Sequence, residues 1–481
     1  MEVQNMSNSS KASQRIAALL DDNSFVEIGA MVTARATDFN MKPTETPSDG
    51  VVTGYGVIEG NLVYVYSQDA SVMNGSVGEM HAKKIANLYD LALKTGAPVI
   101  GLIDSAGLRL QEATDAMNAF GEIYMKQTLA SGVIPQITAV FGNCGGGLAL
   151  IPGLTDFTFM ESKNAKLFVN SPNALDGNYT EKCDTAAADF QSSEAGLVDV
   201  VAEEADIFTQ MRALVAMLPS NNEDDMSYED CTDDLNRASA SLVACAGDTS
   251  IALTEIADDN VFFEVKEAYA KEMVTGFIRL NGSTVGCVAN RSEVIGEDGK
   301  AAEKFDGVLT PNGCAKAAEF INFCDAFNIP VLSLTNVKGY AACTCCEKKI
   351  AKAVAKLTYA FANATVPKVN VVVGNALGTA AIAMNSKAIG ADLTIAWADA
   401  QIGAMNANDA AQIMYSGQGA DVIKEKAAEY AALQTSATGA AKRGYVDQVI
   451  DAADTRKYVV GAFEMLFAKR EDRPAKKHGT V

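Results

Sequence analysis

Short apolar runs alternate with helically spaced apolar residues along the first half of the chain. Residues 50–68 combine continuous and alternating apolar positions, which predicts strands. Residues 78–93 have the apolar spacing of a helix, and the apolar run at 98–103 predicts a buried strand. A helix is expected over residues 110–131, before the next strand. This order of strand, helix, strand and helix indicates an α/β layered fold.

The second half repeats the order of the first. Residues 274–290 are strand-like, and residues 314–326 have the pattern of a helix. A short apolar strand is expected at 331–334, followed by a helix over residues 350–363. The repeat predicts two similar α/β units in one chain.

A glycine turn follows an apolar run in both halves. The first turn is Gly142-Asn143-Cys144-Gly145-Gly146-Gly147, and the second is Gly374-Asn375-Ala376-Leu377-Gly378-Thr379. Five pairs share one spacing in residue number (330 minus 98, for example): Pro98/Pro330, Gly107/Gly339, Pro135/Pro367, Gly142/Gly374 and Gly146/Gly378. Glycine at a strand-to-helix turn lets backbone N–H groups approach a ligand, and the helix N-terminus favours negative charge. Two such turns suggest two oxyanion sites.

A second register supports an internal duplication. Val52-Thr53-Gly54-Tyr55 matches Val274-Thr275-Gly276-Phe277 at an offset of 222, so the second half carries ten extra residues (232 minus 222) between the landmarks. We place the domain boundary in the acidic stretch at residues 221–234. The predicted domains are residues 1–235 and 236–481.

Composition and charge narrow the functional class. The chain is 48% hydrophobic and 21% charged, which is typical of a globular protein with a large core. Its net charge of −21 argues against general binding of nucleic acid or anionic membranes. The polar first 20 residues resemble no secretory signal, and apolar runs are too short for a membrane helix. We therefore expect a cytoplasmic protein.

Histidine and cysteine usage restricts the chemistry further. Only His81 and His478 occur, which disfavours histidine-based triads, and we expect His81 to have a packing role rather than a catalytic one. The ten cysteines lack a disulfide framework. Cys343-Thr344-Cys345-Cys346 could be a metal or redox cluster, but it lacks the second ligand pair of a zinc site. We expect a loop of reduced thiols there and no metal site.

Several segments resemble the carboxyltransferase subunit of biotin-dependent acyl-CoA carboxylases and the matching subunit of the decarboxylases. The likeness covers the propionyl-CoA carboxylase beta type and the methylmalonyl-CoA decarboxylase alpha type, from about residue 15 to 465. It is carried by residues 67–69, 78–79, 104–112, 131–136, 155–160, 323–330, 356–362, 364–368, 386–387 and 396–397. By contrast, neither glycine turn fits the dinucleotide or P-loop patterns.

This resemblance implies two tandem crotonase-like (ClpP/crotonase) domains, with the acyl-CoA side in the N-terminal domain and the biotin side in the C-terminal domain. It implies a homo-oligomer, with a dimer as the minimum and a hexamer as a common form. Catalytic donors would be Gly145, Gly146 and Gly147 toward the thioester, and Gly378, Thr379 and Ala380 toward the biotin ureido group. Substrate contacts would come from Ser105, Ala106, Gly107, Arg109 and Ile382.

The implied cofactor is biotin on a separate carrier protein, with a coenzyme A thioester as substrate. The chain has no Ala-Met-Lys-Met attachment sequence and no ATP-binding module. The implied partners are therefore a biotin carboxyl carrier protein and either a biotin carboxylase subunit or a membrane decarboxylase subunit. With such a partner the protein would lie peripherally at the inner membrane.

The chain departs from the family pattern mainly in its C-terminal half. The second turn usually has glycine where Thr379 stands, and a β-branched residue disfavours positive φ, so we expect an altered biotin end. Many propionyl-CoA-type members have aspartate in place of Ile382, which leaves the acyl chain open. The segment 341–349 replaces a glycine-rich loop, and Met405-Asn406 replaces a Met-Gly turn.

Four alternatives to a carboxylating subunit stay open at this point. The same subunit could act in transcarboxylation or in a sodium-pumping decarboxylase. A hydratase- or hydrolase-like enzyme of the same fold would need a carboxylate pair over the thioester, for which Glu112 and Glu122 are candidates. A non-catalytic structural subunit would fit the altered second turn.

Overall fold

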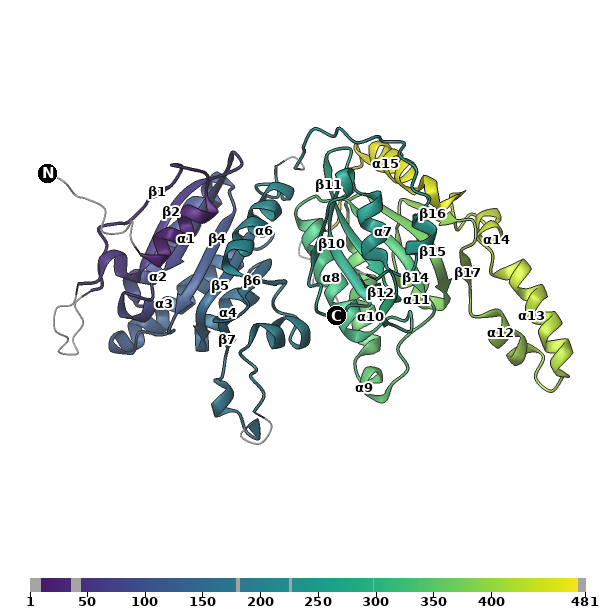
Figure 1. Ribbon diagram of the computed structural model, residues 1–481, viewed down its shortest axis with the longest axis horizontal. Helices are drawn as coiled ribbons and strands as arrows, with labels where there is room; N and C mark the ends of the chain where they lie inside the picture. Colours follow the sequence, from purple (N-terminus) through teal and green to yellow (C-terminus); the bar gives the residue numbers. More distant parts are fainter. Residues whose placement is uncertain (1–9, 36–44, 179–181, 225–226, 297, 475–481) are drawn as a thin grey trace. The chain divides into compact units, whose positions relative to one another are not determined.

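The computed structural model describes residues 10–35, 45–178, 182–224, 227–296 and 298–474. The chain forms two compact units, Met1–Ser227 and Tyr228–Val481. Figure 1 draws the first unit in purple to teal and the second in teal to yellow. The basic segment with His478, at the end of the chain, lies outside the described residues.

The first unit is built on an eight-stranded sheet. Its strand order is β1-β2-β3-β4-β5-β6-β8, and β7 pairs with β5. The strands β1 to β3 are antiparallel, whereas β3 to β8 run parallel along the rest of the sheet. The strands are Val26–Glu27 (β1), Val51–Ile58 (β2), Asn61–Gln68 (β3), Val99–Ser105 (β4), Gln136–Gly145 (β5), Phe157–Glu161 (β6), Lys166–Phe168 (β7) and Val200–Ala202 (β8).

Helices cover the first sheet because its strands are apolar on both faces. The helices α2 (Glu79–Thr95) and α3 (Ala113–Ala130) bury Ile85, Leu88 and Ile123 in one apolar cluster with the strands. The helices α1 (Lys11–Leu19) and α6 (Glu204–Met217) contact each other and the sheet. Continuous apolar strands between helices are typical of parallel α/β sheets. The helix expected at 110–131 begins at Ala113, after a 3₁₀ turn at Leu110–Glu112.

The second unit repeats the sheet of the first in the same order. Its path is β9-β10-β11-β14-β15-β16-β18, and β17 pairs with β15. The strands are Phe262–Val265 (β9), Met273–Leu280 (β10), Ser283–Asn290 (β11), Val331–Val337 (β14), Lys368–Leu377 (β15), Leu393–Trp397 (β16), Gln401–Gly403 (β17) and Gln448–Ile450 (β18). The tandem α/β fold expected from the duplication is therefore confirmed.

The second core is packed by helices in the same manner. The helices α8 (Pro311–Ala326) and α10 (Ile350–Asn363) pack on each other, and α8 contacts β10 and β11. The helices α7 (Thr249–Ile256), α14 (Ala437–Lys442) and α15 (Thr455–Leu466) contribute to a core cluster with the strands. Two further helices, α12 (Ala407–Met414) and α13 (Ala420–Gln434), pack on each other and extend from this core (Figure 1).

The offset in residue number between equivalent positions of the two units changes from 222 to 232 because the second unit has an added hairpin. A two-stranded sheet of β12 (Glu293–Ile295) and β13 (Ala301–Lys304) lies between β11 and α8. In the first unit, β3 and α2 are joined by a shorter segment with a 3₁₀ turn, Met73–Gly75. The ten extra residues of the second half are thus accommodated by this small hairpin.

The duplication extends to close contacts. A Cβ on Gly54 would lie 2.2 Å from the carbonyl oxygen of Val26 in β1, and one on Gly276 would lie 2.2 Å from that of Phe263 in β9. Both glycines thus make room for the first strand of their unit. Two buried lysines, Lys84 and Lys316, also occupy equivalent positions, because they have the same spacing as the paired glycine turns.

These two lysines make equivalent hydrogen bonds in the two units. Each amine donates to two backbone carbonyls: Lys84 to those of Ser48 and Val51, and Lys316 to those of Lys266 and Tyr269. Burial disfavours the charged amine, so it lowers the pKa of Lys84 to about 8 and that of Lys316 to about 7. Each lysine ties its helix to the segment before the central strands.

Candidate active site

Both glycine turns follow a central strand and have a glycine at positive φ, although the helical turn that follows is 3₁₀ in the first unit and α in the second. In the first unit, β5 ends at Gly145 and the 3₁₀ turn Gly146–Ala149 follows, then α4 (Leu150–Gly153). In the second unit, β15 ends at Leu377 and α11 (Gly378–Ala383) follows directly. Gly146 has φ of 64° and Gly378 has φ of 65°, a left-handed conformation that L side chains rarely adopt. N–H groups at the start of a helical turn have no acceptor within it, so both turns present donors.

The structure brings the first turn together with the loop that follows β4. Ser105 pairs with Cys144 across the two strands. A Cβ on Gly107 would lie 3.2 Å from the carbonyl oxygen of Gly145, so the two segments are in close contact. The predicted residues Ser105, Gly107 and Gly145 therefore belong to one small region.

Hydrogen bonds hold this region in place. The amide of Ala106 donates to the Asn74 carbonyl at 2.9 Å, and the amide of Gly107 donates to Ser105 Oγ at 3.1 Å. The Tyr124 hydroxyl, on α3, donates to the Gly147 carbonyl at 2.5 Å. Tyr124 was missed from the sequence, because a tyrosine on a predicted helix carries no signal of a turn beyond it.

Arg109 lies in a buried ionic cluster beneath the loop. Its guanidinium pairs with Asp49 at 2.7 Å and Glu112 at 2.8 Å, and it donates to the Ser76 carbonyl at 2.7 Å. The side chains of Arg109 and Asp49 are fully buried. Burial raises the pKa of Asp49, although Arg109 opposes the shift. Because its N–H donors are engaged by these partners, Arg109 holds the loop in position. Its contact with substrate stays a prediction.

The second turn differs from the first through two side chains. The Tyr340 hydroxyl donates to Thr379 Oγ1 at 2.8 Å. Thr379 lies inside α11, and the positive φ belongs to Gly378. The positive φ that a β-branched residue disfavours is therefore not required of Thr379. Ala380 is buried and Ile382 is 41% exposed, which leaves an apolar side chain open beside the turn.

The same position is apolar and open beside the first turn. Leu150 is the counterpart of Ile382 at the spacing of the two turns, and it is 43% exposed. Ile382 was expected from the sequence and Leu150 was missed, although the shared spacing could have identified it.

The charge of the side chain at one equivalent position differs between the two units. Asp104 in the first unit pairs with Arg15 at 3.0 Å. Asn336 holds the equivalent position in the second unit and accepts from the amide of Asn375 at 3.0 Å. A carboxylate paired with arginine thus stands where the second unit has a neutral amide.

His81 is buried beside the Arg109 cluster. Its Nδ1 donates to the Asp49 carbonyl at 3.0 Å, and its Nε2 accepts from the Gln68 amide at 3.2 Å, with the tautomer assigned from these partners. Burial lowers the pKa of His81 from 6.5 to about 3. His81 is therefore a neutral packing residue, as expected.

The buried His81 predicts a pH dependence of stability. Because the unfolded state binds a proton below pH 6.5 and the folded state only below about pH 3, stability falls with acidification across this window. From pH 7 to pH 4.5, wild type should lose about 2.5 kcal/mol more unfolding free energy than His81→Gln. Urea unfolding at the two pH values measures this difference. Equal losses in both proteins would contradict it.

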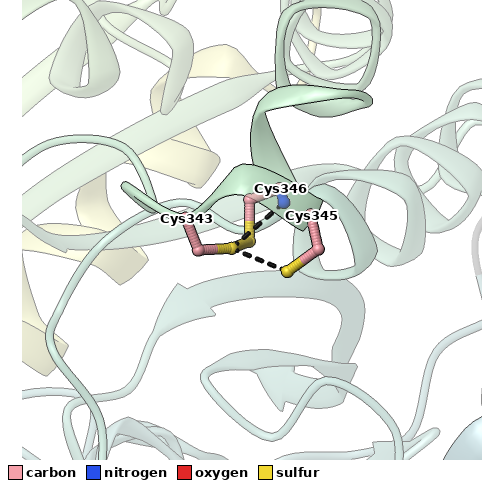
Figure 2. Close-up of side chains that lie close together, drawn as sticks. All are labelled: Cys343, Cys345 and Cys346. Carbon is pink, nitrogen blue, oxygen red and sulfur yellow. Dashed lines mark hydrogen bonds between the residues drawn. A yellow bond between two sulfur atoms is a disulfide. The ribbon is translucent and has the colours of Figure 1, made fainter.

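The expectation of reduced thiols at residues 343–346 is wrong. Cys343 and Cys346 form a disulfide, and the Sγ of Cys345 lies 3.0 Å from that of Cys343 (Figure 2). Two residues of the short helix α9 (Thr344–Glu347) and its N-cap Cys343 thus gather three sulfur atoms. Spacing alone could not distinguish thiols from a disulfide, because Cys-x-x-Cys suits both.

Comparison with known proteins places the whole chain in one group. The carboxyl transferase domain family matches residues 4–481. The methylmalonyl-CoA decarboxylase subunit alpha of Propionigenium modestum is 38% identical over 499 residues, covering 100% of this chain and 95% of that protein. The propionyl-CoA carboxylase beta chain of Roseobacter denitrificans is 38% identical over 484 residues, covering 98% and 93%.

A solved structure resembles the described fold closely. The transcarboxylase 12S hexamer with methylmalonyl-coenzyme A and methylmalonic acid bound has a TM-score of 0.91 and 37% sequence identity. The match covers 97% of this chain and 92% of that one.

Proposed function

This chain belongs to the carboxyl transferase family, and we propose that it moves a carboxyl group between biotin on a separate carrier protein and the α-carbon of a short acyl-CoA. The observation that carries the proposal is the pair of equivalent turns with Gly146 and Gly378 at φ of 64° and 65°. Carboxyl transfer of this kind places negative charge on two oxygens, one on biotin and one on the acyl-CoA. Two sets of backbone donors suit that requirement.

The chain's own groups act mainly through electrostatics. The N–H groups of Gly145, Gly146 and Gly147 donate to the thioester oxygen as it becomes enolate-like. Preorganised donors of this kind contribute a few kcal/mol each because they need no reorganisation during the reaction. Tyr124 fixes the Gly147 carbonyl and thus the orientation of the turn. Ser105, Ala106 and Gly107 would line the same end.

The second turn has a donor set that fits the biotin ureido oxygen. Gly378, Thr379 and Ala380 offer backbone N–H groups, and the open side chain of Ile382 offers apolar surface beside them. Biotin, when bound, supplies the carboxyl group and a ureido nitrogen that takes the acyl α-proton. The protein then needs no strong side-chain base, which agrees with a neutral, buried His81.

The relatives support a short acyl chain and an oligomer. One relative's name specifies methylmalonyl-CoA and another's propionyl-CoA, which supports this substrate pair over acetyl- and malonyl-CoA. The matched transcarboxylase is a hexamer, which supports a homo-oligomer with a dimer as its minimum. We infer a biotin carboxyl carrier protein as partner, with either a biotin carboxylase subunit or a membrane decarboxylase subunit.

None of the helices among the described residues has the length and apolar character needed to cross a bilayer.

The hydratase-like alternative loses support from the position of Glu112. Its carboxylate is held by Arg109 at 2.8 Å and accepts the Glu79 amide at 2.6 Å. Glu122 is exposed on α3. Because the Glu112 carboxylate is occupied by these two contacts, it is poorly placed to act as a general base over a thioester.

Decarboxylation by the purified protein tests the proposal. Methylmalonyl-CoA and malonyl-CoA are incubated with and without free biotin, and the CoA esters are separated by chromatography. We expect biotin-dependent conversion of methylmalonyl-CoA to propionyl-CoA, with malonyl-CoA converted more slowly. Binding of both esters without any turnover would contradict carboxyl transfer and favour a structural subunit.

A further inference from the structure

Three cysteines gather on an exposed loop between β14 and α10. The ligand atoms of Cys343, Cys345 and Cys346 all lie within 4.8 Å of one another. Cys343 and Cys346 are joined as a disulfide, and the Cys345 thiol is free (Figure 2). Cys343 and Cys345 are exposed, and Cys346 is partly exposed. Small molecules in solution can therefore reach these sulfur atoms.

The local backbone explains why these sulfurs meet. Cys343 is the N-cap of α9, and its sulfur accepts the Cys346 amide at 3.0 Å. Residues three apart lie on one side of a helical turn. The Cα atoms of Cys343 and Cys346 are 5.1 Å apart, within the usual range for disulfides. The same N–H donor stabilises a thiolate on Cys343 when the bond is open.

Most other cysteines of the chain are buried, which shields their thiols from small molecules in solution. Burial raises the pKa of Cys144, Cys287 and Cys324, and it raises the pKa of Cys314 to about 12. Thiol groups of this kind stay protonated and react slowly. Cys183 is exposed and free, which makes it a control for simple accessibility.

We propose that Cys343, Cys345 and Cys346 form a thiol–disulfide exchange site that reacts with small-molecule disulfides and thiols. The Cys343 thiolate attacks one sulfur of the small disulfide, whose S–S bond breaks and releases one thiol. The Cys346 thiolate then attacks Cys343 Sγ, forms the protein disulfide and releases the second thiol. Two protein thiols lose two electrons and two protons, and the small disulfide gains them.

Cys345 makes this site different from a simple Cys-x-x-Cys pair. Its sulfur lies 3.0 Å from Cys343 Sγ, so its thiolate can attack that atom and release Cys346 as a thiolate. Cys343 is then the shared sulfur of two alternative disulfides. The arrangement gives the loop two oxidised forms and one reduced form.

Thiol mapping of the full chain in mixtures of reduced and oxidised glutathione tests the proposal. Alkylation and peptide mass spectrometry should show reversible loss of two reactive thiols from the segment 343–346. Cys345→Ser and Cys346→Ser should each keep this loss, because Cys343 retains one partner. Cys343→Ser should abolish it, and Cys183→Ser should leave it unchanged.

Two results would overturn the exchange site. The first is that all three thiols stay alkylatable at every glutathione ratio. The second is that the reduced protein binds one Zn²⁺ through these cysteines and resists oxidation by glutathione disulfide, which would make the cluster a metal site. The double variant Cys345→Ser/Cys346→Ser should lose one thiol only, as a glutathione adduct on Cys343.

Discussion

Replacing Gly146 by alanine should lower biotin-dependent turnover about 100- to 1,000-fold, the loss typical of one oxyanion donor. Gly146 has φ of 64°, and a Cβ there would meet no atom within 4 Å. The substitution therefore acts through backbone conformation, since an L residue at positive φ costs about 1–2 kcal/mol. Relief of this strain rotates the peptide and turns the N–H groups away from the thioester. Initial rates with methylmalonyl-CoA measure the loss.

Gly60→Ala is the matched control for this change. Gly60 has φ of 84° and equally open space, but it lies in the hairpin between β2 and β3. It should share the strain and keep full activity. If Gly60→Ala and Gly146→Ala lose activity equally, the first turn is not the site of thioester activation.

Gly378→Ala separates the roles of the two turns. Gly378 has φ of 65°, and an added Cβ would lie 3.3 Å from the Ala404 carbonyl oxygen. If the second turn serves biotin, this variant should lose stimulation by free biotin and keep the slow biotin-independent loss of the carboxyl group. Gly146→Ala should lose both activities. The reverse pattern would exchange the assignments.

Arg109→Met should lower the free energy of unfolding of the first unit by about 3–5 kcal/mol, the cost of leaving buried charge unpaired. Asp49 and Glu112 would then keep their carboxylates in a buried site without the guanidinium. Methionine fills similar volume, so the loss reflects charge more than packing. Urea unfolding followed by circular dichroism measures it.

Arg35→Met is the surface comparison for Arg109→Met. Arg35 also bridges two acids, Glu79 and Asp115, but its side chain is 55% exposed. Exposed pairs contribute about 0–1 kcal/mol, so this variant should be nearly neutral.

In Arg109→Met the acids should have raised pKa values, so stability should recover as pH falls through those values. No recovery would argue against unpaired charge as the cause.

The glycine turns could be predicted from sequence because their cause is local. A glycine at positive φ after an apolar strand is visible in a few residues, and its repetition at a constant spacing strengthened the pattern. The strands and helices of both cores followed for the same reason, because their apolar spacing reflects burial on a known face.

Other features depend on contacts far apart in the chain. The motif around Arg109 suggested a substrate contact, whereas its partner Asp49 lies 60 residues earlier, in a different segment. The helix α13 has one buried residue, Ala427, among its 15 residues, so it has no apolar stripe to detect. The state of Cys343 and Cys346 depends on sulfur positions that spacing does not define.

The common geometry of Gly146 and Gly378 has an evolutionary consequence. A gene that doubles in tandem begins with two copies of one site, so an ancestral single unit would have offered the same donors to every ligand. The paired Asp104 and the neutral Asn336 then record where the copies diverged after the fusion. Specialisation of one copy for each partner would have required few substitutions, since a glycine at positive φ was kept in both turns.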